Sequence, residues 1–248
     1  MAEQAFIGGA PWYDALSGGA RRLDREGGLL LRVLSGAPLP RVLDLACGTG
    51  IHALFFAAHG AEVTACDLSS EMIHRAQAAR SHPRIAYEVA DMRRPPAGLF
   101  GLALCLGNSL SLLPGFDDVQ SCLSQTATVL APHGYFMVQL LNYANPALRK
   151  PRQRTETATF DGGEVFARKT FTPGNDSTKL ELEYTVQRTG EPDRVTTETV
   201  QLRHWSIDDL QKAARTAGFA SEMVLGNFDG TLYERGSSGD LIVLMRRL

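Results

Sequence analysis

The sequence has few cysteines, and they are not spaced as metal ligands. Cys47, Cys66, Cys105 and Cys122 form no C-x-x-C pattern. The first three lie in apolar, strand-like runs, so we expect buried free thiols rather than zinc ligands or disulfides. The sequence also has no cluster of carboxylates or histidines with the spacing of a metal site. We therefore predict no metal centre.

No charge of one sign dominates, and long hydrophobic runs are missing. The formal net charge is -2 at pH 7, which argues against a nucleic-acid partner. No N-terminal stretch combines a basic start with an apolar run of signal length, and no run is long enough to span a membrane. We expect a cytoplasmic protein without a membrane partner. The oligomeric state is not predicted.

What the sequence does contain is a strand, a glycine turn and a helix start between Arg41 and Leu54. Residues 41–46 indicate a short buried strand. Gly48 and Gly50 then permit a tight turn, and the apolar spacing from Ile51 is helical. Such a junction exposes backbone N–H groups at the positive end of a helix dipole, which predicts a site for a nucleotide or a carboxylate.

Two ligands compete for this site. Residues 48–53 fit the G-x-G-x-x-A pattern of dinucleotide-binding proteins. Asp44, however, stands at the strand end, where it would repel a pyrophosphate and favour a ligand that brings an amino group. S-adenosylmethionine carries an ammonium and a sulfonium and no phosphate. The stretch resembles the first motif of class I methyltransferases that use this cofactor, with Ala46 in place of the first glycine.

The second predicted strand, residues 61–67, also ends in an acid. Asp67 is placed to accept hydrogen bonds from both ribose hydroxyls of a nucleoside. Dinucleotide and S-adenosylmethionine proteins share this role, so Asp67 does not separate them. Leu68 and Met72 are candidates to pack on the adenine.

The third and fourth predicted strands cover residues 85–91 and 99–106. The methyltransferase resemblance implies that Asp91 faces the adenine amino group and that the backbone of Met92 faces a ring nitrogen. Leu106 and Asn108 follow at the position opposite the methyl donor, although Asn108 could instead cap the next turn. Residues 104–109 resemble the glycine N-methyltransferase group.

Beyond the fourth strand, the pattern predicts a helix over 116–130, a turn at 132–134 and a fifth strand over 135–141. Residues 155–202 then alternate between polar and apolar types. Three Gly-, Pro- and Asp-containing turn signals divide them into three or four antiparallel strands. Residues 180–187 and 201–205 look like the corresponding sheet of glycine N-methyltransferase.

The expected fold is α/β: a Rossmann-like, seven-stranded, mostly parallel sheet with helices on both faces and a small antiparallel β lid inserted after the fifth strand. Residues 1–148 would form an N-terminal segment, frayed over 1–9, and the cofactor-binding core. Residues 149–205 would form the lid, or substrate insertion. Residues 206–248 would supply a last helix and the last two strands.

Candidate substrate-binding residues are fewer and less specific. Tyr13 either lines the pocket or anchors the N-terminal segment by burial. Arg21 and Arg22 are expected in solvent, with binding of the cofactor carboxylate by one of them as the alternative. The remaining candidates lie at the ends of the fifth and last lid strands, where ligands bind in open α/β sheets: Asn142, Tyr143, Arg203 and Trp205.

Arg203 could pair with a substrate carboxylate or be an ordinary strand-edge arginine. His204 is the best candidate for a general base, and Tyr143 a second candidate catalytic residue, although a lone histidine is more often structural.

The resemblance implies transfer of a methyl group from S-adenosylmethionine to a small molecule, favouring an amine nitrogen. Transfer is an in-line displacement, so alignment can supply much of the rate, and a neutral amine needs no strong base. Three alternatives stay open: an O-methyltransferase of a natural product, an NAD-dependent oxidoreductase, and a protein that binds the cofactor without turnover. The identity of the acceptor is not predicted.

Overall fold

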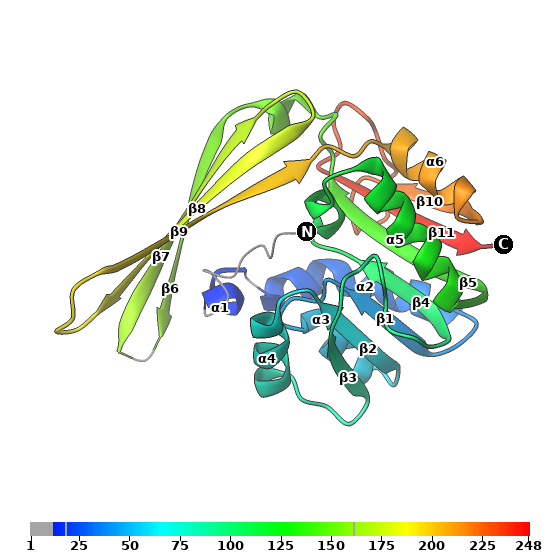
Figure 1. Ribbon diagram of the computed structural model, residues 1–248, viewed down its shortest axis with the longest axis horizontal. Helices are drawn as coiled ribbons and strands as arrows, with labels where there is room; N and C mark the ends of the chain where they lie inside the picture. The colour runs from blue at the N-terminus through cyan, green and yellow to red at the C-terminus, as the bar shows by residue number, and fades with distance from the viewer. Residues whose placement is uncertain (1–11, 18, 161) are drawn as a thin grey trace.

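The computed structural model describes residues 12–17, 19–160 and 162–248. The prediction of a frayed segment over 1–9 lies outside these residues. A seven-stranded sheet forms the centre of the molecule, in the order β10-β11-β5-β4-β1-β2-β3 (Figure 1). Its strands are β1 (Arg41–Leu45), β2 (Glu62–Asp67), β3 (Ile85–Val89), β4 (Phe100–Cys105), β5 (Leu130–Leu141), β10 (Phe219–Leu225) and β11 (Asp240–Arg247).

Only β11 runs against its neighbours in this sheet, because it pairs antiparallel with both β5 and β10. The strands β1 to β5 are paired in parallel. All six residues of β4 are buried, as expected for a central strand covered on both faces. The predicted α/β fold with a seven-stranded, mostly parallel sheet is therefore confirmed.

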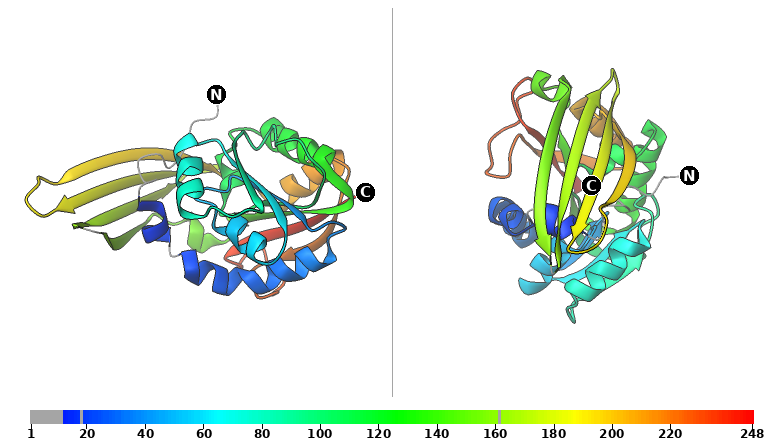
Figure 2. Two further views of the ribbon diagram at one scale, coloured as in Figure 1. Left: turned by 90° about the horizontal axis from the view of Figure 1, so that it is seen from below. Right: turned by 90° about the vertical axis from the view of Figure 1, so that its left-hand side faces the viewer.

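Helices cover both faces of this sheet, as Figure 2 shows. The helices α2 (Gly19–Gly36) and α3 (Ile51–Ala58) contribute to one buried cluster, and α5 (Phe116–Val129) and α6 (Ile207–Thr216) to the other. The remaining helical segments are α1 (Tyr13–Ser17), α4 (Ser70–Ala79) and the 3-10 turns η2 (Ser109–Leu112) and η3 (Pro146–Arg149).

Serine side chains cap the starts of two helices. The Ser69 side chain accepts a hydrogen bond from the Met72 amide at the start of α4. Ser206 forms a capping box with Asp209 at the start of α6. Such caps satisfy backbone donors that a helix leaves unpaired, and each stabilises a helix by about 1 kcal/mol.

A second sheet forms the lid, with the order β6-β7-β8-β9. Its strands are β6 (Arg152–Phe160), β7 (Gly163–Pro173), β8 (Ser177–Arg188) and β9 (Arg194–Arg203), each antiparallel to the next. The sheet projects from one end of the core (Figure 1). At its base, Phe171, Leu180 and Leu202 share a buried cluster with Tyr143, so the lid is packed onto the core.

One predicted turn is wrong. Residues 132–134 lie inside β5, which runs from Leu130 to Leu141. The pairing with β4 jumps from Phe100↔Leu130 to Leu102↔Tyr135, so the extra residues form a bulge in the strand. His133 has a φ of 62°, a left-handed conformation that satisfies the local Pro and Gly signals without ending the strand.

Further expectations concern thiols, membranes and metals. All four cysteines are buried and free, as predicted. Among the helices in the described ranges, none is both long and apolar enough to cross a membrane. Residues 12–17, 19–160 and 162–248 also contain no group of three or more side chains placed to hold a metal ion.

Candidate active site

A cavity of about 270 Å³ lies between the carboxyl ends of the central strands and the base of the lid. Eight of the eleven residues predicted to bind the cofactor line it: Ala46, Gly48, Asp67, Leu68, Met72, Asp91, Met92 and Asn108. These residues follow four different strands. Because parallel strands end at the same edge of a sheet, the fold brings them together there.

The turn after β1 needs glycine at two points. Gly48 and Gly50 have φ values of 55° and 82°. These left-handed backbone angles are unfavourable for residues that carry a Cβ atom. At Gly50, moreover, a Cβ atom would lie 2.5 Å from the hydroxyl of Tyr87. Ala46 adopts the same left-handed region with φ at 53°, at a cost of about 1–2 kcal/mol for a residue with a Cβ. The turn brings backbone close to the cavity.

Asp67 is fixed at the cavity wall by two backbone amides. Its Oδ2 accepts a hydrogen bond of 2.9 Å from the Gly48 amide, and its Oδ1 accepts one of 2.9 Å from the Ser69 amide. Burial raises the pKa of Asp67, and these hydrogen bonds oppose that shift. The carboxylate is thus oriented before any ligand arrives, with further acceptor capacity on both oxygens.

Asp44 lies behind this wall rather than on it. The residue is 1% exposed, and its Oδ2 has no hydrogen-bond partner. Burial raises the pKa of Asp44 to about 6, although the charges of His52 and Arg22 oppose the shift. A buried carboxylate oxygen without a partner is costly, so this position suits a ligand that brings a cation.

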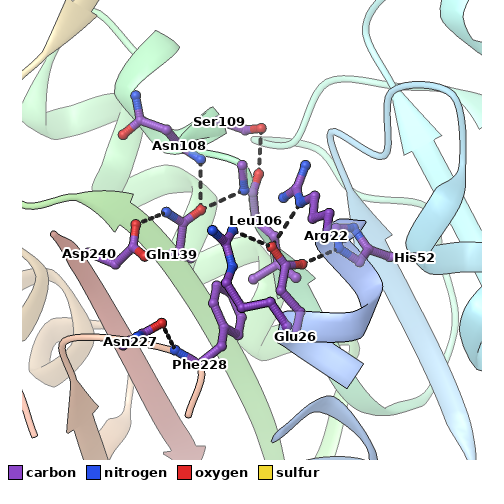
Figure 3. Close-up of polar contacts among 12 residues, drawn as sticks. Arg22, Glu26, His52, Leu106, Asn108, Ser109, Gln139, Asn227, Phe228 and Asp240 are labelled. Carbon is purple, nitrogen blue, oxygen red and sulfur yellow. Dashed lines mark hydrogen bonds and ion pairs between the residues drawn. The ribbon is translucent and has the colours of Figure 1, made fainter. Parts of the chain in front are cut away.

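Glu26 on α2 links Arg22 and His52 in a buried network (Figure 3), and the charges of His52 and Arg22 act on Asp44. Glu26, 1% exposed, accepts a hydrogen bond of 2.9 Å from Arg22 Nε and lies 2.8 Å from His52 Nε2. Burial acts to raise the pKa of Glu26, but the hydrogen bond to His52 and the charge of Arg22 lower it below its ordinary value. Glu26 therefore holds Arg22 in place.

Arg22 reaches the cavity edge at Gly107. A Cβ atom on Gly107 would lie 3.2 Å from Arg22 Nη2, and Gly107 lines the cavity. The sequence allowed Arg22 a role at the cofactor site only as the alternative to solvent exposure. It gave no role to Glu26, on α2, or to His52, on α3, because tertiary packing decides which side chains of the two helices meet.

A second polar chain fixes the loop after β4. Gln139 Oε1 accepts hydrogen bonds from the Gly107 and Asn108 amides at 2.8 and 3.1 Å, and Gln139 Nε2 donates to Asp240 at 2.8 Å (Figure 3). The Asn108 side chain bridges Tyr143 and the Leu141 amide. A glutamine inside the apolar run 135–141 is the sequence signal that could have pointed to this support.

Asp91 lines the cavity, but its carboxylate already has a cationic partner. Arg93 contacts both oxygens of Asp91, at 3.0 Å through Nε and at 2.5 Å through Nη2. The same guanidinium pairs with Asp118 at the start of α5. Hydrogen bonding to Arg93 lowers the pKa of Asp91. The predicted contact of Asp91 with the adenine stays a prediction.

Three predicted cofactor contacts do not line the cavity. Gly50 caps α3 at the end of the turn, Asp44 lies behind the wall, and Leu106 is buried in the core. Leu106 contributes through its carbonyl, which accepts a hydrogen bond of 2.7 Å from Ser109. These residues would therefore influence the cofactor indirectly: Gly50 through the turn, Asp44 through its charge, and Leu106 through the loop after β4.

Of the predicted substrate-binding and catalytic residues, only Tyr13 lines the cavity. Burial raises the pKa of its hydroxyl. His204 stacks on Tyr143, with ring centres 4.2 Å apart, and its Nε2 lies 2.8 Å from Thr178 Oγ1. Burial lowers the pKa of His204 to about 4. The His204–Tyr143 pair thus stands behind the lining as packed structure.

The other three candidates are engaged elsewhere. Asn142 donates to the carbonyls of Arg235 and Ser238, which ties β5 to the loop before β11. Arg203 forms an ion pair of 2.8 Å with Asp176 at the lid surface. Trp205 donates to the Leu110 carbonyl at 3.1 Å. Their closeness to strand ends was visible in the sequence, but the direction of each side chain was not.

The lid contributes lining residues that the sequence did not single out. They are Lys169, Phe171, Leu180, Leu182 and Leu202. They lie on one face of β7, β8 and β9, since Phe171 is opposite Leu180 and Lys169 is opposite Leu182. Because side chains alternate along a strand, the sequence predicts which residues share a face. It does not predict which of the two faces points to the cavity.

Comparison with known proteins agrees with the geometry. Residues 42–134 match the family model described as a methyltransferase domain. A glycine/sarcosine N-methyltransferase of Parasynechococcus marenigrum is 32% identical over 136 residues, which are 53% of this chain and 48% of that protein. The chain thus spans about half the length of the curated relatives it matches first.

Two solved structures share the fold over almost the whole chain. An S-adenosylmethionine-dependent methyltransferase from Clostridium acetobutylicum superposes with a TM-score of 0.80 at 18% identity, covering 98% of this chain and 99% of that one. An amino pentose methyltransferase from Micromonospora echinaspora, solved with S-adenosylmethionine bound, gives a TM-score of 0.71 at 20% identity, covering 99% and 98%.

The chain carries a methyltransferase domain over residues 42–134. Its fold is that of the two S-adenosylmethionine-dependent methyltransferase structures described above, in agreement with the resemblance of residues 41–54. Its relatives include the glycine/sarcosine N-methyltransferases that residues 104–109 resemble. The matched family model and the two superposed structures are those of methyltransferases.

Proposed function

We propose that the protein transfers the methyl group of S-adenosylmethionine to an amine nitrogen of a small molecule. The observation that carries the proposal is the continuous cavity, which joins the strand ends of the core to the base of the lid. One ligand can occupy the core end and a second the lid end. Residues 149–205 would then serve substrate binding, and the rest of the chain cofactor binding.

The residues at the core end fit the cofactor. Asp67 presents oriented carboxylate oxygens to ribose hydroxyls, and Leu68 and Met72 offer apolar contact to the adenine. The unpartnered oxygen of Asp44 suits the methionine ammonium. Arg22, held by Glu26, suits the methionine carboxylate. The ribose hydroxyls, the ammonium and the carboxylate of the cofactor therefore each have a partner of complementary charge or hydrogen-bonding capacity.

The cofactor, when bound, supplies a methyl group on a positively charged sulfur, which is an activated leaving group. The protein then has to place the acceptor nitrogen in line with the carbon–sulfur bond. Alignment of this kind can account for about 7–11 kcal/mol of a barrier. The loop 107–109, fixed by Gln139, and Tyr13 form the walls between which the acceptor would approach.

An amine is favoured over a hydroxyl because the cavity offers little to remove a proton. A neutral amine has its own lone pair, whereas a hydroxyl needs a general base or a metal. The lining within the described residues contains no histidine. Its carboxylates Asp67 and Asp91 are held by backbone amides and by Arg93. His204, the predicted base, stacks behind Tyr143.

The proposal is tested by product detection. The protein is incubated with S-adenosylmethionine carrying a labelled methyl group and with panels of amines, amino acids and phenols. Label is expected on amine nitrogen, with S-adenosylhomocysteine formed in equal amount. Label on phenols alone would establish O-methylation instead. Tight binding of S-adenosylhomocysteine without any transfer would indicate a protein that holds the cofactor without turnover.

We also propose a cytoplasmic location, supported by the four reduced, buried thiols, which persist in reducing compartments. Fractionation of the native host cells, followed by immunodetection of the protein, tests this proposal. Recovery in an oxidising, extracytoplasmic fraction would contradict it.

A further inference from the structure

The lid end of the cavity is lined mainly by apolar side chains. Four of the five lining residues that the lid contributes are apolar: Phe171, Leu180, Leu182 and Leu202. On the core side, Leu112, Leu113 and Leu141 complete the wall. Phe171 and Leu180 are opposite one another on β7 and β8, at the spacing where cross-strand side chains touch. The surface is therefore continuous across the lid.

The only charged lining residue from the lid, among the residues the structure describes, is Lys169. Its Nζ lies 2.5 Å from Glu156 Oε2 on the neighbouring strand. The two side chains are 25% and 32% exposed, so their charges compensate each other at the cavity rim. A ligand that docked an anion on Lys169 would have to displace Glu156 first.

Arg152 fixes the aromatic part of this wall. Its guanidinium carbon lies 4.2 Å from the centre of the Phe171 ring, and its Nη1 donates to the Leu148 carbonyl at 3.0 Å. A cation over the face of an aromatic ring is attracted by the ring's quadrupole. Arg152 therefore helps to hold the Phe171 ring in place as part of the apolar cavity wall.

From these observations we infer that the acceptor is an amine carried on an apolar body, and that free glycine is a poor acceptor. This inference rests on the proposed amine methyltransferase function and specifies its substrate class. A hydrocarbon body gains free energy against the leucine wall. The carboxylate of a free amino acid would lose water there without a cation in the described part of the lid lining to pair with it. Lys169 is paired with Glu156, and Arg152 lies on the Phe171 ring and is not among the lining residues. Arg22, the other nearby cation, stands at the Gly107 end, which the cofactor's own carboxylate would occupy.

Binding is measured by titrating ethylamine, butylamine, hexylamine and glycine into the protein saturated with S-adenosylhomocysteine. Burial of one methylene is worth about 0.8 kcal/mol, so Kd should fall about fourfold for each methylene added. Glycine should bind more weakly than butylamine. In transfer assays with labelled S-adenosylmethionine, kcat/KM should rise in the same order. A Kd independent of chain length, or glycine or sarcosine as the best acceptor, would overturn the inference.

Two variants of the same strand provide the matched test. Phe171→Leu shortens the wall, whereas Phe166→Leu makes the same change on the opposite face of β7. Phe171→Leu should raise the Kd of hexylamine roughly fivefold and leave the Kd of S-adenosylhomocysteine unchanged. Phe166→Leu should change neither. Leu182→Val, a smaller change in the same wall, replaces Phe171→Leu if that protein does not fold.

The outcomes separate the two proposals. Equal effects of Phe171→Leu and Phe166→Leu on hexylamine binding would show that the acceptor does not bind against this wall, even if amines are methylated. Chain-length-dependent binding of amines without any methyl transfer would instead contradict the proposed function and support the assignment of the apolar ligand class to this cavity.

Discussion

Asp44 is a carboxylate in a buried environment that disfavours its charged form. It is 1% exposed, and one of its oxygens has no hydrogen-bond partner. Its ionised form is favoured by His52 and Arg22 but opposed by burial, which raises its pKa to about 6. A ligand ammonium near this oxygen would compensate the buried charge of Asp44. The desolvation that disfavours the ionised carboxylate in the free protein would then favour a cationic ligand over a neutral one.

Replacing Asp44 by asparagine keeps the shape and removes the charge. Against an ammonium, loss of a charge-assisted contact should weaken S-adenosylhomocysteine by about 1.5–3 kcal/mol. Methylthioadenosine, which lacks the amino acid, should bind the variant almost as well as the parent. Calorimetry with both ligands checks this. Equal weakening of the two would show that Asp44 only shapes the loop, and tighter NAD binding would argue for a dinucleotide site.

The raised pKa of Asp44 also predicts a pH dependence. A carboxyl whose pKa is about 6 when folded and about 3.9 when unfolded contributes stability below the lower value that is lost as pH rises through 6. Ligand binding has the opposite sign, because the ammonium needs the ionised form. Affinity for S-adenosylhomocysteine should therefore fall up to about tenfold per pH unit below 6.

Methylthioadenosine is the control for that titration, since it meets the same Asp67 without needing Asp44. Its affinity should vary less over the same range, and the Asp44→Asn protein should lose the difference between the two ligands. Parallel pH profiles for both ligands in the parent protein would assign the titration to another group, with Asp67 the first to examine because burial raises its pKa too.

For Asp67, the ribose assignment is tested by a double-mutant cycle. Asp67→Ala should weaken adenosine by about 1–3 kcal/mol, because two hydroxyls lose a charged acceptor. It should weaken 2′,3′-dideoxyadenosine little, because the hydroxyls are already absent. Calorimetry on the four combinations gives the coupling. Equal losses for both nucleosides would mean that Asp67 acts only through the Gly48 amide.

The lining of the core end of the cavity was predictable from the sequence because its positions follow from strand ends. Ala46, Asp67, Asp91 and Asn108 lie at or shortly after the ends of β1, β2, β3 and β4, and the sheet places all such residues at one edge. Arg203 and His204 also follow a strand, but one of the lid. There the twist of the strand and the packing of Tyr143 decide which side chains face the cavity, and neither is encoded in local periodicity.

At the scale of elements, α2 depends on one buried carboxylate. Glu26 is the shared partner of Arg22 and His52, so Glu26→Gln leaves two cationic or polar groups in the core without a charged acceptor. The free energy of unfolding should fall by about 3 kcal/mol. Glu71→Gln is the matched control, since Glu71 pairs with Arg75 at the same i,i+4 spacing but is 43% exposed.

The control should lose less than about 1 kcal/mol, as exposed helix pairs do. Urea titration of the three proteins measures the difference. Similar losses for the two variants would mean that water reaches Glu26 and that α2 is not anchored by it. Because Glu26 has a lowered pKa, its contribution to stability should also disappear as pH falls through that pKa.

The lid is expected to respond to ligands unevenly along its length. Its base packs in a buried cluster, whereas residues 189–197 at its tip are exposed. Product cofactor should therefore slow amide exchange over 169–182, next to the cavity, while exchange over 189–197 stays unchanged. Hydrogen-exchange mass spectrometry resolves the two regions. Identical exchange everywhere with and without ligand would mean a rigid lid.

The elements themselves were largely predictable, because capping residues and apolar spacing are local signals. Serine is a preferred N-cap residue, and Ser69 and Ser206 cap the starts of two helices. The four lid strands lie within the alternating region 155–202 and its borders. The turn at 132–134 failed for a physical reason. Pro132 and Gly134 do bend the chain, but the pairing of β5 with β4 and β11 continues on both sides, so tertiary pairing absorbs the bend as a bulge.

For the whole molecule, the sequence predicted seven strands and a lid but not how the two enclose one cavity. Lining residues come from the α1 segment, from the ends of five core strands and from three lid strands. Helical and strand periods are set within about ten residues, whereas this enclosure joins positions more than a hundred residues apart. The preference for an apolar acceptor was therefore out of reach of the sequence alone.

The place of β11 between β5 and β10 sets an order of events during translation. Lid strands pair with their neighbours in sequence, so this sheet can form as soon as it leaves the ribosome. One edge of β5 stays unpaired until β11 has been synthesised. Asp240 at the start of β11 lies 101 positions after Gln139 of β5, its hydrogen-bond partner. The Gln139 support of the loop 107–109 is completed in that same late step. We therefore expect the lid sheet of a nascent chain to form before the loop 107–109 is fully supported.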